Sequence, residues 1–303
     1  MKNWTTNDIP SQKGKLYLVT GANSGTGFAT AKTLAQKGAK IIMAVRNMDK
    51  GENAVSKIKN DVPDAKLELM HLDLTDLNSI EKFVADFTNQ HHNLDVLINN
   101  AGIALPNKRT ETKQGFEGHF GINHLGHFAL TGKLLPILKA TKSARIVTVA
   151  SFVPKQSKSI MNWNDLQYID KFDGMTSYGQ SKLANIMFGL QLDKKLDQSN
   201  CPVISVLANP GFTKSGMQKD MGFIAKSMTF FMSHSTEMGM LPILRCAVDP
   251  NVKGGEFYGP LKMKEMRGYP ELTEAPEPAL IEEDRQKLWK ISEQMTNTTY
   301  NFS

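Results

Sequence analysis

The amino-acid sequence predicts an α/β fold with a single open, doubly wound parallel sheet and helices on both faces. Short apolar and β-branched runs alternate with longer amphipathic stretches along most of the chain. Strands that alternate with helices of about 10–15 residues form βαβ units, and right-handed crossovers place the helices on both sides of the sheet. The runs with strand character are residues 15–20, 40–45, 66–71, 94–99, 145–150 and 203–208.

The segments between and after these runs follow from periodicity and composition. Residues 25–37 carry apolar side chains at helical spacing, which predicts a helix. The stretch 270–278 is rich in Pro and Glu and predicts a surface connection before a final helix at 279–294. No repeat or low-complexity linker divides the chain. We therefore expect one domain over 1–303, with a core at about 14–260 and a C-terminal extension at about 261–303.

Composition argues against several classes of protein. The 303 residues include 36 Lys and Arg against 30 Asp and Glu, and the net charge of +6 is spread along the chain. It forms no basic block of the kind that binds nucleic acid. Cys201 and Cys246 form no CxxC pair, which suits a reducing cytosol. We expect a cytoplasmic protein without a membrane anchor, because the start lacks a signal-peptide pattern and no apolar run reaches about 18 residues.

A glycine-rich turn, TGANSGTG at 20–27, follows the first predicted strand. Gly21 permits a tight turn, Gly25 lets the backbone approach a pyrophosphate, and Gly27 lets the helix pack closely on the strand. The spacing G-x3-G-x-G differs from G-x-G-x-x-G, and three glycines alone also suit an ordinary strand-to-helix turn. Their place at the first βα junction favours a nucleotide site. Its expected residues are Gly21, Asn23, Ser24, Gly25, Thr26 and Gly27.

Four motifs resemble the short-chain dehydrogenase/reductase family, whose members have a Rossmann-type sheet. They are TGANSGTG (20–27), NNAG (99–102), Ser151 and YGQSK (178–182), and the resemblance covers about residues 14–260. AVRN (44–47), GINHLGHFALT (121–131) and SYGQSKLAN (177–185) are most similar to the retinol-dehydrogenase-like branch. The protochlorophyllide reductases are a neighbouring group, but they carry a Cys six residues after the catalytic Tyr, where this chain has Ala184.

The resemblance implies a dinucleotide cofactor, and the end of the second strand indicates which one. NAD-preferring relatives carry an acidic residue at that position. Here Val45 occupies it and Arg46 follows. An arginine can form a fork with a 2′-phosphate, which favours NADP(H) over NAD(H), although Arg46 could also be a solvated charge at the start of a helix.

The resemblance implies further cofactor contacts. Asp73 and Leu74 lie in the segment expected beside the adenine, although Asp73 could equally be the N-cap of a helix at 75–89. Near the nicotinamide, a hydroxyl is expected to contact the cofactor, and Thr213 is the alternative to Ser215 for this contact. The other expected cofactor residues are Asn99, Ala101 and Gly102 near the adenosine ribose, and Pro210, Gly211 and Ser215 near the nicotinamide.

The resemblance also implies a proton-transfer group around Tyr178. A tyrosine with a pKa of about 10 is a poor base at neutral pH. Lys182 lies one helical turn later on the same face, and its ammonium would lower the pKa of the phenol. By resemblance, Ser151 holds the substrate oxygen and Asn123 bends its helix and holds a water beside Lys182. The gap between Ser151 and Tyr178 is longer than usual, and its insert, 152–176, resembles a segment of the retinol-dehydrogenase-like branch.

Other interpretations compete with parts of this assignment. His119, His124 and His127 could suggest a metal site, but no Cys or carboxylate completes a ligand set, so structural roles are favoured. Ser151 lacks the G-x-S-x-G setting of a hydrolase nucleophile. The Met-rich segment 217–240 could be ordinary helix core or a mobile lid over an apolar substrate.

These observations predict an NADP(H)-dependent oxidoreductase that interconverts a carbonyl compound, an apolar aldehyde or ketone, and an alcohol, with reduction favoured. The alternatives are a double-bond reductase of the protochlorophyllide type and a nucleotide-binding regulatory protein without turnover. By resemblance, homo-oligomers could form through the helices that carry Asn123 and Tyr178, and the C-terminal extension could block or extend that assembly. The identity of the substrate does not follow from the sequence.

Overall fold

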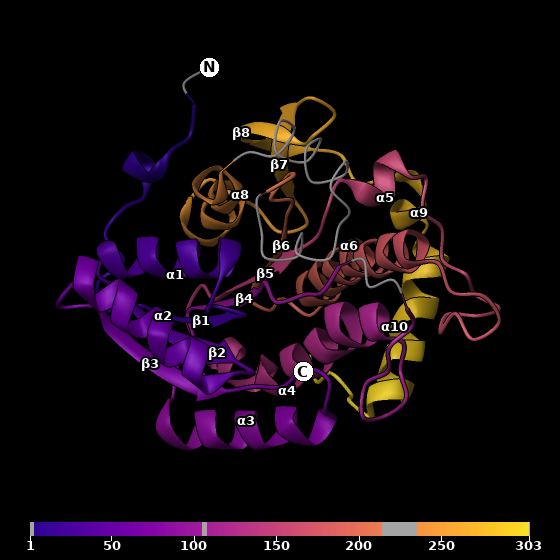
Figure 1. Ribbon diagram of the computed structural model, residues 1–303, viewed down its shortest axis with the longest axis horizontal. Coiled ribbons are helices and arrows are strands. Elements are labelled where there is room, and N and C mark those ends of the chain that lie inside the picture. Colours follow the sequence, from indigo (N-terminus) through magenta and orange to yellow (C-terminus); the bar gives the residue numbers. More distant parts are fainter. Residues whose placement is uncertain (1–2, 105–107, 214–234, 303) are drawn as a thin grey trace.

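The structure is a computed structural model, and it describes residues 3–104, 108–213 and 235–302. Its described strands form one eight-stranded sheet in the order β3-β2-β1-β4-β5-β6-β7-β8 (Figure 1). The first seven strands in this order are parallel to their neighbours, and β8 is antiparallel to β7. The strands are β1 Leu16–Thr20, β2 Lys40–Val45, β3 Lys66–His71, β4 Val96–Asn99, β5 Arg145–Val149, β6 Ile204–Ala208, β7 Phe257–Lys262 and β8 Arg267–Thr273.

The two faces of the sheet bury alternate residues of the same strands, as strand geometry requires. Tyr17 and Val19 of β1 pack in a cluster with the helices α1 (Gly25–Gln36), α2 (Met48–Asp61) and α8 (Thr236–Val248). Leu16 and Leu18 pack in a second cluster with α3 (Leu77–Gln90), α4 (Gly126–Ala140) and α6 (Gly174–Gln198). Figure 1 shows α1 and α3 on opposite sides of β1–β3. The doubly wound parallel sheet predicted from the sequence is confirmed.

The predicted bounds of the helices agree with the structure less closely than those of the strands. The first helix, predicted at 25–37, is confirmed as α1, and the final helix begins three residues later than predicted, after the short α9. The helical elements are η1 Thr6–Asp8, α1 Gly25–Gln36, α2 Met48–Asp61, α3 Leu77–Gln90, the π-helical η2 Phe120–Leu125, α4 Gly126–Ala140, α5 Val153–Gln156, α6 Gly174–Gln198, α8 Thr236–Val248, α9 Glu277–Leu280 and α10 Glu282–Thr296.

Two expectations about local structure were wrong. The N-cap of α3 is Asp76, whose carboxylate accepts from the Asn78 amide. Asp73, for which a cap was the alternative to a place beside the adenine, instead accepts from the amide and hydroxyl of Thr75. The surface connection expected at 270–278 contains the end of β8. Pro270 obscured this strand in the sequence, and it is tolerated because β8 lies at the edge of the sheet and pairs only with β7.

The C-terminal residues pack on the side of the sheet that carries α4 and α6. The hydroxyl of Tyr300 donates to the Phe128 carbonyl at 2.7 Å, and its ring packs against Trp289 of α10. A Cβ on Gly132 would lie 2.6 Å from the Tyr300 ring, so α4 needs glycine where this ring crosses it. Through α10, the predicted extension packs on η2, α4 and α6, and η2 and α6 carry Asn123 and Tyr178. Among the described helices, none has the length and hydropathy needed to cross a membrane.

Candidate active site

The glycine loop joins β1 to α1 and leaves no room for side chains. Gly21 has φ 68°, and a Cβ there would lie 3.0 Å from the Ala101 Cα. A Cβ on Gly27 would lie 2.5 Å from both the Asn100 Nδ2 and the Gly21 carbonyl oxygen. These are closer than any ordinary contact, so α1 can start this near to β4 only with glycine at position 27.

The N-terminus of α1 suits an anionic group. Its N-cap, Ser24, makes no side-chain capping hydrogen bond, and the first turn contains no acidic residue. The first amides of a helix have no partner inside the helix, and the helix dipole favours negative charge there. Together with the glycine-lined turn, this arrangement fits the pyrophosphate of a dinucleotide.

Asn100 holds the glycine loop against β4, a role that sequence reasoning did not assign to it. Its Nδ2 donates to the Thr20 carbonyl at 2.8 Å, and its Oδ1 accepts from the Thr26 hydroxyl at 2.9 Å. The neighbouring Asn99, which was assigned, is buried and donates to the Thr131 hydroxyl on α4. The NNAG motif contains both residues, but their opposite directions follow from strand geometry, which places successive side chains on opposite faces.

The expected adenosine side lies at the carboxyl ends of β2 and β3. Val45 is buried as the last residue of β2, and Arg46 is exposed immediately before the N-cap of α2, Asn47. Within the described part of the chain, the Arg46 guanidinium forms no ion pair. Asp73 and the buried Leu74 follow β3, next in the sheet to β2. Arg46 is therefore free to meet an anionic ligand at this edge.

The four predicted catalytic residues meet beyond the carboxyl ends of β4 and β5. Ser151 lies two residues after β5, and its side chain lies close enough to Tyr178 of α6 to lower the pKa of that phenol. The Lys182 Nζ donates to the Val149 carbonyl at 3.1 Å. A Cβ on Gly102 would lie 3.0 Å from the Asn123 Oδ1 and 3.7 Å from the Lys182 Nζ, so these two groups border the same glycine.

Asn123 connects the segment after β4 to α6. Its Oδ1 accepts from the Ile103 amide at 2.9 Å, while its Nδ2 contacts the Ile103 carbonyl at 3.1 Å and the Ser181 hydroxyl at 3.0 Å. The chain is π-helical over Phe120–Leu125, so the helix departs from α-helical geometry at this residue, as predicted. A water held beside Lys182 stays a prediction.

Burial changes the acid–base properties of the catalytic pair. Lys182 is 5% exposed, and burial lowers its pKa to about 8. Burial also raises the pKa of the Tyr178 phenol, and the nearby Ser151 side chain opposes that rise. At neutral pH both groups hold their protons. The expected lowering of the phenol pKa by Lys182 stays a prediction.

The expected nicotinamide side is described only up to Thr213. Gly211 has φ 69°, and its amide donates to the Asn209 Oδ1 at 2.9 Å, which fixes the turn after β6 that includes Pro210. Ser215 lies outside the described residues, as does most of the Met-rich segment considered as a lid. Met240 is buried in α8, where the Thr33 hydroxyl contacts its sulfur, so this one methionine is ordinary core.

The three neighbouring histidines have separate partners. His119 contacts the Ser177 hydroxyl, His124 the Ser292 hydroxyl and His127 the Thr20 hydroxyl. Burial lowers the pKa of His124 to about 3 and that of His127 to about 4, so both rings are neutral. Over the described ranges, no group of three or more His, Cys, Asp or Glu side chains is placed to hold a metal ion.

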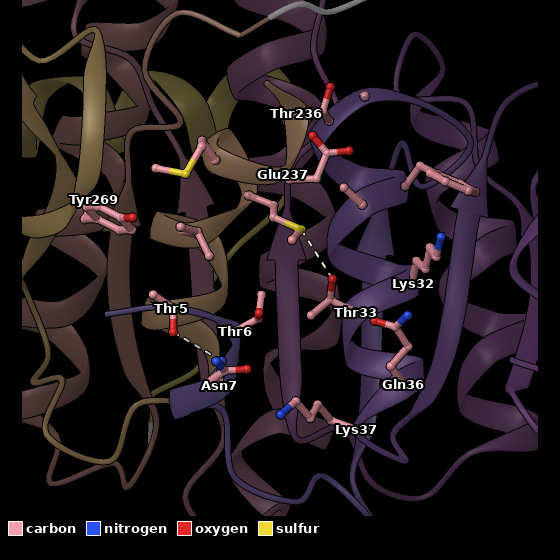
Figure 2. Close-up of a pocket in the computed structure, with 16 residues that line it drawn as sticks. Thr5, Thr6, Asn7, Lys32, Thr33, Gln36, Lys37, Thr236, Glu237 and Tyr269 are labelled. Carbon is pink, nitrogen blue, oxygen red and sulfur yellow. Dashed lines mark hydrogen bonds between the residues drawn. The ribbon is translucent and has the colours of Figure 1, made fainter. Parts of the chain in front are cut away.

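A pocket of about 780 Å³ lies away from the catalytic residues, between η1, α1 and α8 (Figure 2). Figure 2 shows Lys32 and Gln36 of α1 along one side, and Thr5 of the N-terminal segment on another. Gly25 is the one predicted cofactor residue that lines it, and none of the four predicted catalytic residues does. We therefore do not place the reaction in this pocket.

Comparison with known proteins identifies the family. Residues 15–222 match the family model of the short chain dehydrogenases. Mouse retinol dehydrogenase 12 is 36% identical over 263 residues, which cover 85% of this chain and 81% of the relative. Mouse polyprenol dehydrogenase is 34% identical over 254 residues, covering 81% and 75%. A crystal structure of an uncharacterised protein from Mycobacterium paratuberculosis has a TM-score of 0.82 and 33% identity, covering 99% of this chain and 100% of that one.

The chain therefore belongs to the short-chain dehydrogenase/reductase family, in its retinol-dehydrogenase-like branch, as the motifs predicted. It is an oxidoreductase that interconverts carbonyl and alcohol groups of a small-molecule substrate with a nicotinamide dinucleotide.

Proposed function

We propose that the protein is an NADP(H)-dependent reductase of apolar aldehydes or ketones, with Tyr178 as the proton donor. One observation carries this proposal: Ser151, Tyr178, Lys182 and Asn123 meet at one end of the sheet, next to the glycine loop, which has no room for side chains. Ligands of open α/β sheets bind beyond the carboxyl ends of the strands, and these residues lie at that end.

The bound dinucleotide supplies the hydride. The Ser151 hydroxyl holds the carbonyl oxygen beside Tyr178, and the phenol donates its proton to that oxygen as negative charge develops on it. A phenol whose pKa is raised by burial keeps its proton at neutral pH, which suits an acid in the reductive direction. The Lys182 ammonium favours the phenolate that remains, and Asn123 fixes the segment between them.

The preference for NADP(H) rests on Arg46. Its exposed guanidinium follows the last residue of β2, where a carboxylate would repel a 2′-phosphate and an arginine can bind one through two parallel hydrogen bonds. The last residue of β2 is the buried Val45, so no acidic side chain lies at that position.

The proposed apolar character of the substrate rests on the relatives and on composition. Two relatives are named for retinol and polyprenol, both long apolar alcohols. The segment that follows the turn after β6 is rich in Met and Phe, which suit an adaptable apolar wall. We further propose that the protein acts in the cytoplasm, where reduced NADP favours reduction.

The test is a pair of titrations with NADPH and NADH, followed by nicotinamide fluorescence, on the wild type and on Arg46→Ala. We expect the wild type to bind NADPH at least about tenfold more tightly, which is about 1.4 kcal/mol. Arg46→Ala should lose that margin while its NADH affinity changes little. Lys57→Ala removes an exposed positive charge from the far part of α2 and serves as the matched control.

The outcomes separate the parts of the proposal. A wild-type preference for NADH would contradict the role of Arg46 and point to alcohol oxidation. Binding of neither dinucleotide would contradict the whole assignment. Tight NADPH binding without consumption on a broad panel of apolar aldehydes and ketones would favour a regulatory protein instead.

A further inference from the structure

We propose that His119 is a positioning residue for Tyr178, and that Glu117 and Ser177 hold His119 in place. This inference rests on the proposed function, because it assigns a role in the same proton transfer. It concerns a buried cluster at the start of the helix that carries Asn123. None of the assigned catalytic residues belongs to this cluster.

Glu117 is the fixed base of this cluster. Its side chain is fully buried, and its two carboxylate oxygens accept from the backbone amides of His119 at 2.9 Å and Phe120 at 2.8 Å. Its own amide donates to the Gln167 side chain at 2.7 Å. A buried carboxylate is costly unless it is hydrogen-bonded, so these bonds hold it in one position.

The His119 ring is fixed at its edge and on its face. Its Nδ1 lies 2.8 Å from the Ser177 Oγ and 3.2 Å from a Glu117 carboxylate oxygen. Its plane stacks on the Phe172 ring at a centroid distance of 6.3 Å and an interplanar angle of 10°. The ring is fully buried, so it has no solvent into which it could turn.

This fixed ring meets the catalytic tyrosine. The rings of His119 and Tyr178 are edge to face, with centroids 5.7 Å apart and an angle of 68° between their planes. Such pairs have a defined geometry. Tyr178 itself is partly exposed, and the Ser151 side chain lies near its hydroxyl. The direction of its ring therefore depends on the surface against which it packs.

The same histidine also fixes the backbone next to Tyr178. Ser177 directly precedes it in the first turns of α6, and its hydroxyl bonds to the His119 Nδ1. The His119 side chain thus contacts both the ring of Tyr178 and the residue that directly precedes it. Displacements of about 1 Å at a reacting group can reduce turnover about 100-fold. Loss of His119 should lower kcat and leave the glycine loop intact, since that loop is built on β1, α1 and β4.

The experiment compares three variants. His119→Ala removes both contacts, His119→Phe keeps a ring against Tyr178, and His119→Asn keeps a polar group near Ser177. We expect kcat to fall about 10- to 100-fold in His119→Ala and less in each of the other two, with NADPH affinity unchanged in all. The two milder variants carry the test if His119→Ala does not fold.

A second histidine provides the matched control. His91 is buried, lies 3.2 Å from a Glu68 oxygen and packs on the Phe87 ring, at the opposite end of α3 from the cofactor edge. His91→Ala removes a comparable histidine–glutamate–aromatic contact without touching Tyr178. It should lower stability and leave kcat unchanged. If the His119 variants lose no more turnover than His91→Ala, or lose NADPH binding in parallel with turnover, the proposal is wrong.

A readout that does not use turnover separates this inference from the proposed function. The absorbance difference between a protein and its Tyr178→Phe variant, titrated with pH in the wild-type background and in the His119→Ala background, reports the Tyr178 phenol in each. Burial raises the pKa of this phenol, so loosening its packing in His119→Ala should shift the titration to lower pH. An unshifted titration would overturn the inference even if the wild type reduces carbonyls. A shifted one would support it even if no substrate on the panel is turned over.

Discussion

The two sides of the candidate site are built in opposite ways. On the cofactor side, β1, α1 and β4 approach each other because side chains are missing, and at Gly27 even one methyl group would meet the Gly21 carbonyl at 2.5 Å. On the catalytic side, α6 and η2 approach each other through buried polar side chains. Glu117, His119 and Asn123 are all buried there, and each has a hydrogen-bond partner across or along the cluster.

The difference shows how each side can fail. The cofactor side uses backbone amides and helix direction to bind an anion, so it is damaged by added atoms. The catalytic side uses specific donors and acceptors, so it is damaged by removed ones, and each loss leaves a buried partner unsatisfied. Substitutions that add or remove single groups should therefore separate cofactor binding from turnover.

The largest expected effect is the removal of one oxygen from the catalytic side. Tyr178→Phe keeps the ring against His119 and removes only the proposed proton donor. We expect kcat to fall about 10²- to 10⁴-fold, the usual contribution of general acid catalysis, with NADPH affinity unchanged. Steady-state kinetics with NADPH and an apolar aldehyde measure the first, and fluorescence titration the second.

Tyr258→Phe is the matched control, because this tyrosine is buried and its hydroxyl also has a polar partner, a Glu256 oxygen at 2.9 Å. Its kcat should stay at the wild-type level. Retained turnover in Tyr178→Phe would end the acid–base assignment and leave the cofactor side unaffected.

The next effect is the addition of one carbon to the cofactor side. In Gly27→Ala the new methyl group would press on the Gly21 carbonyl and on Asn100, and neither can move without shifting the loop. We expect NADPH to bind about 10- to 100-fold more weakly, and stability to fall by about 1–3 kcal/mol, as is usual for overpacking. Dinucleotide titration and chemical denaturation measure the two.

Gly189→Ala separates these effects, because its Cβ would lie 2.6 Å from a Leu207 methyl, far from the loop. This variant should lose stability and keep its NADPH affinity. Equal weakening of NADPH binding in both variants would mean that Gly27 acts only through general stability.

Local patterns predicted most of the sheet and failed at its edge. The six predicted strands are present within two residues of their bounds, because buried parallel strands have long apolar runs bounded by turn residues. β7 and β8 contain Gly259, Pro260 and Pro270, which local rules exclude from central strands. Only the sheet order shows that β8 is an edge strand, and sheet order is a tertiary property.

The candidate site divides in the same manner. The glycines, and Tyr178 with Lys182, belong to short motifs whose spacing is set within one element, and Asn123 and Ser151 were assigned by resemblance to family motifs, so sequence alone could propose them. Asn100, Glu117 and His119 act through contacts with residues distant in the chain, such as Asn100 with Thr20 and His119 with Ser177. No spacing rule encodes such contacts. Asp73 was considered as a cap because Asx residues suit caps, but Asp76 lies next to the helix start.

The smallest expected effect tests whether the buried catalytic charge reduces stability. Burial lowers the pKa of Lys182 from its ordinary 10.5 to about 8, so below pH 8 the folded protein holds a buried charge that the unfolded chain solvates. Between pH 8 and 10.5 the unfolded state binds the proton and the folded state does not, so this group's contribution to stability rises with pH.

Lys182→Met removes the charge, and Asn185 still donates to the Val149 carbonyl. We expect the variant to be more stable than the wild type by about 1–2 kcal/mol at pH 7, with a smaller margin at higher pH. Denaturation at several pH values measures this, and a variant less stable than the wild type at pH 7 would show that the lysine's packing and hydrogen bond outweigh the cost of burying its charge.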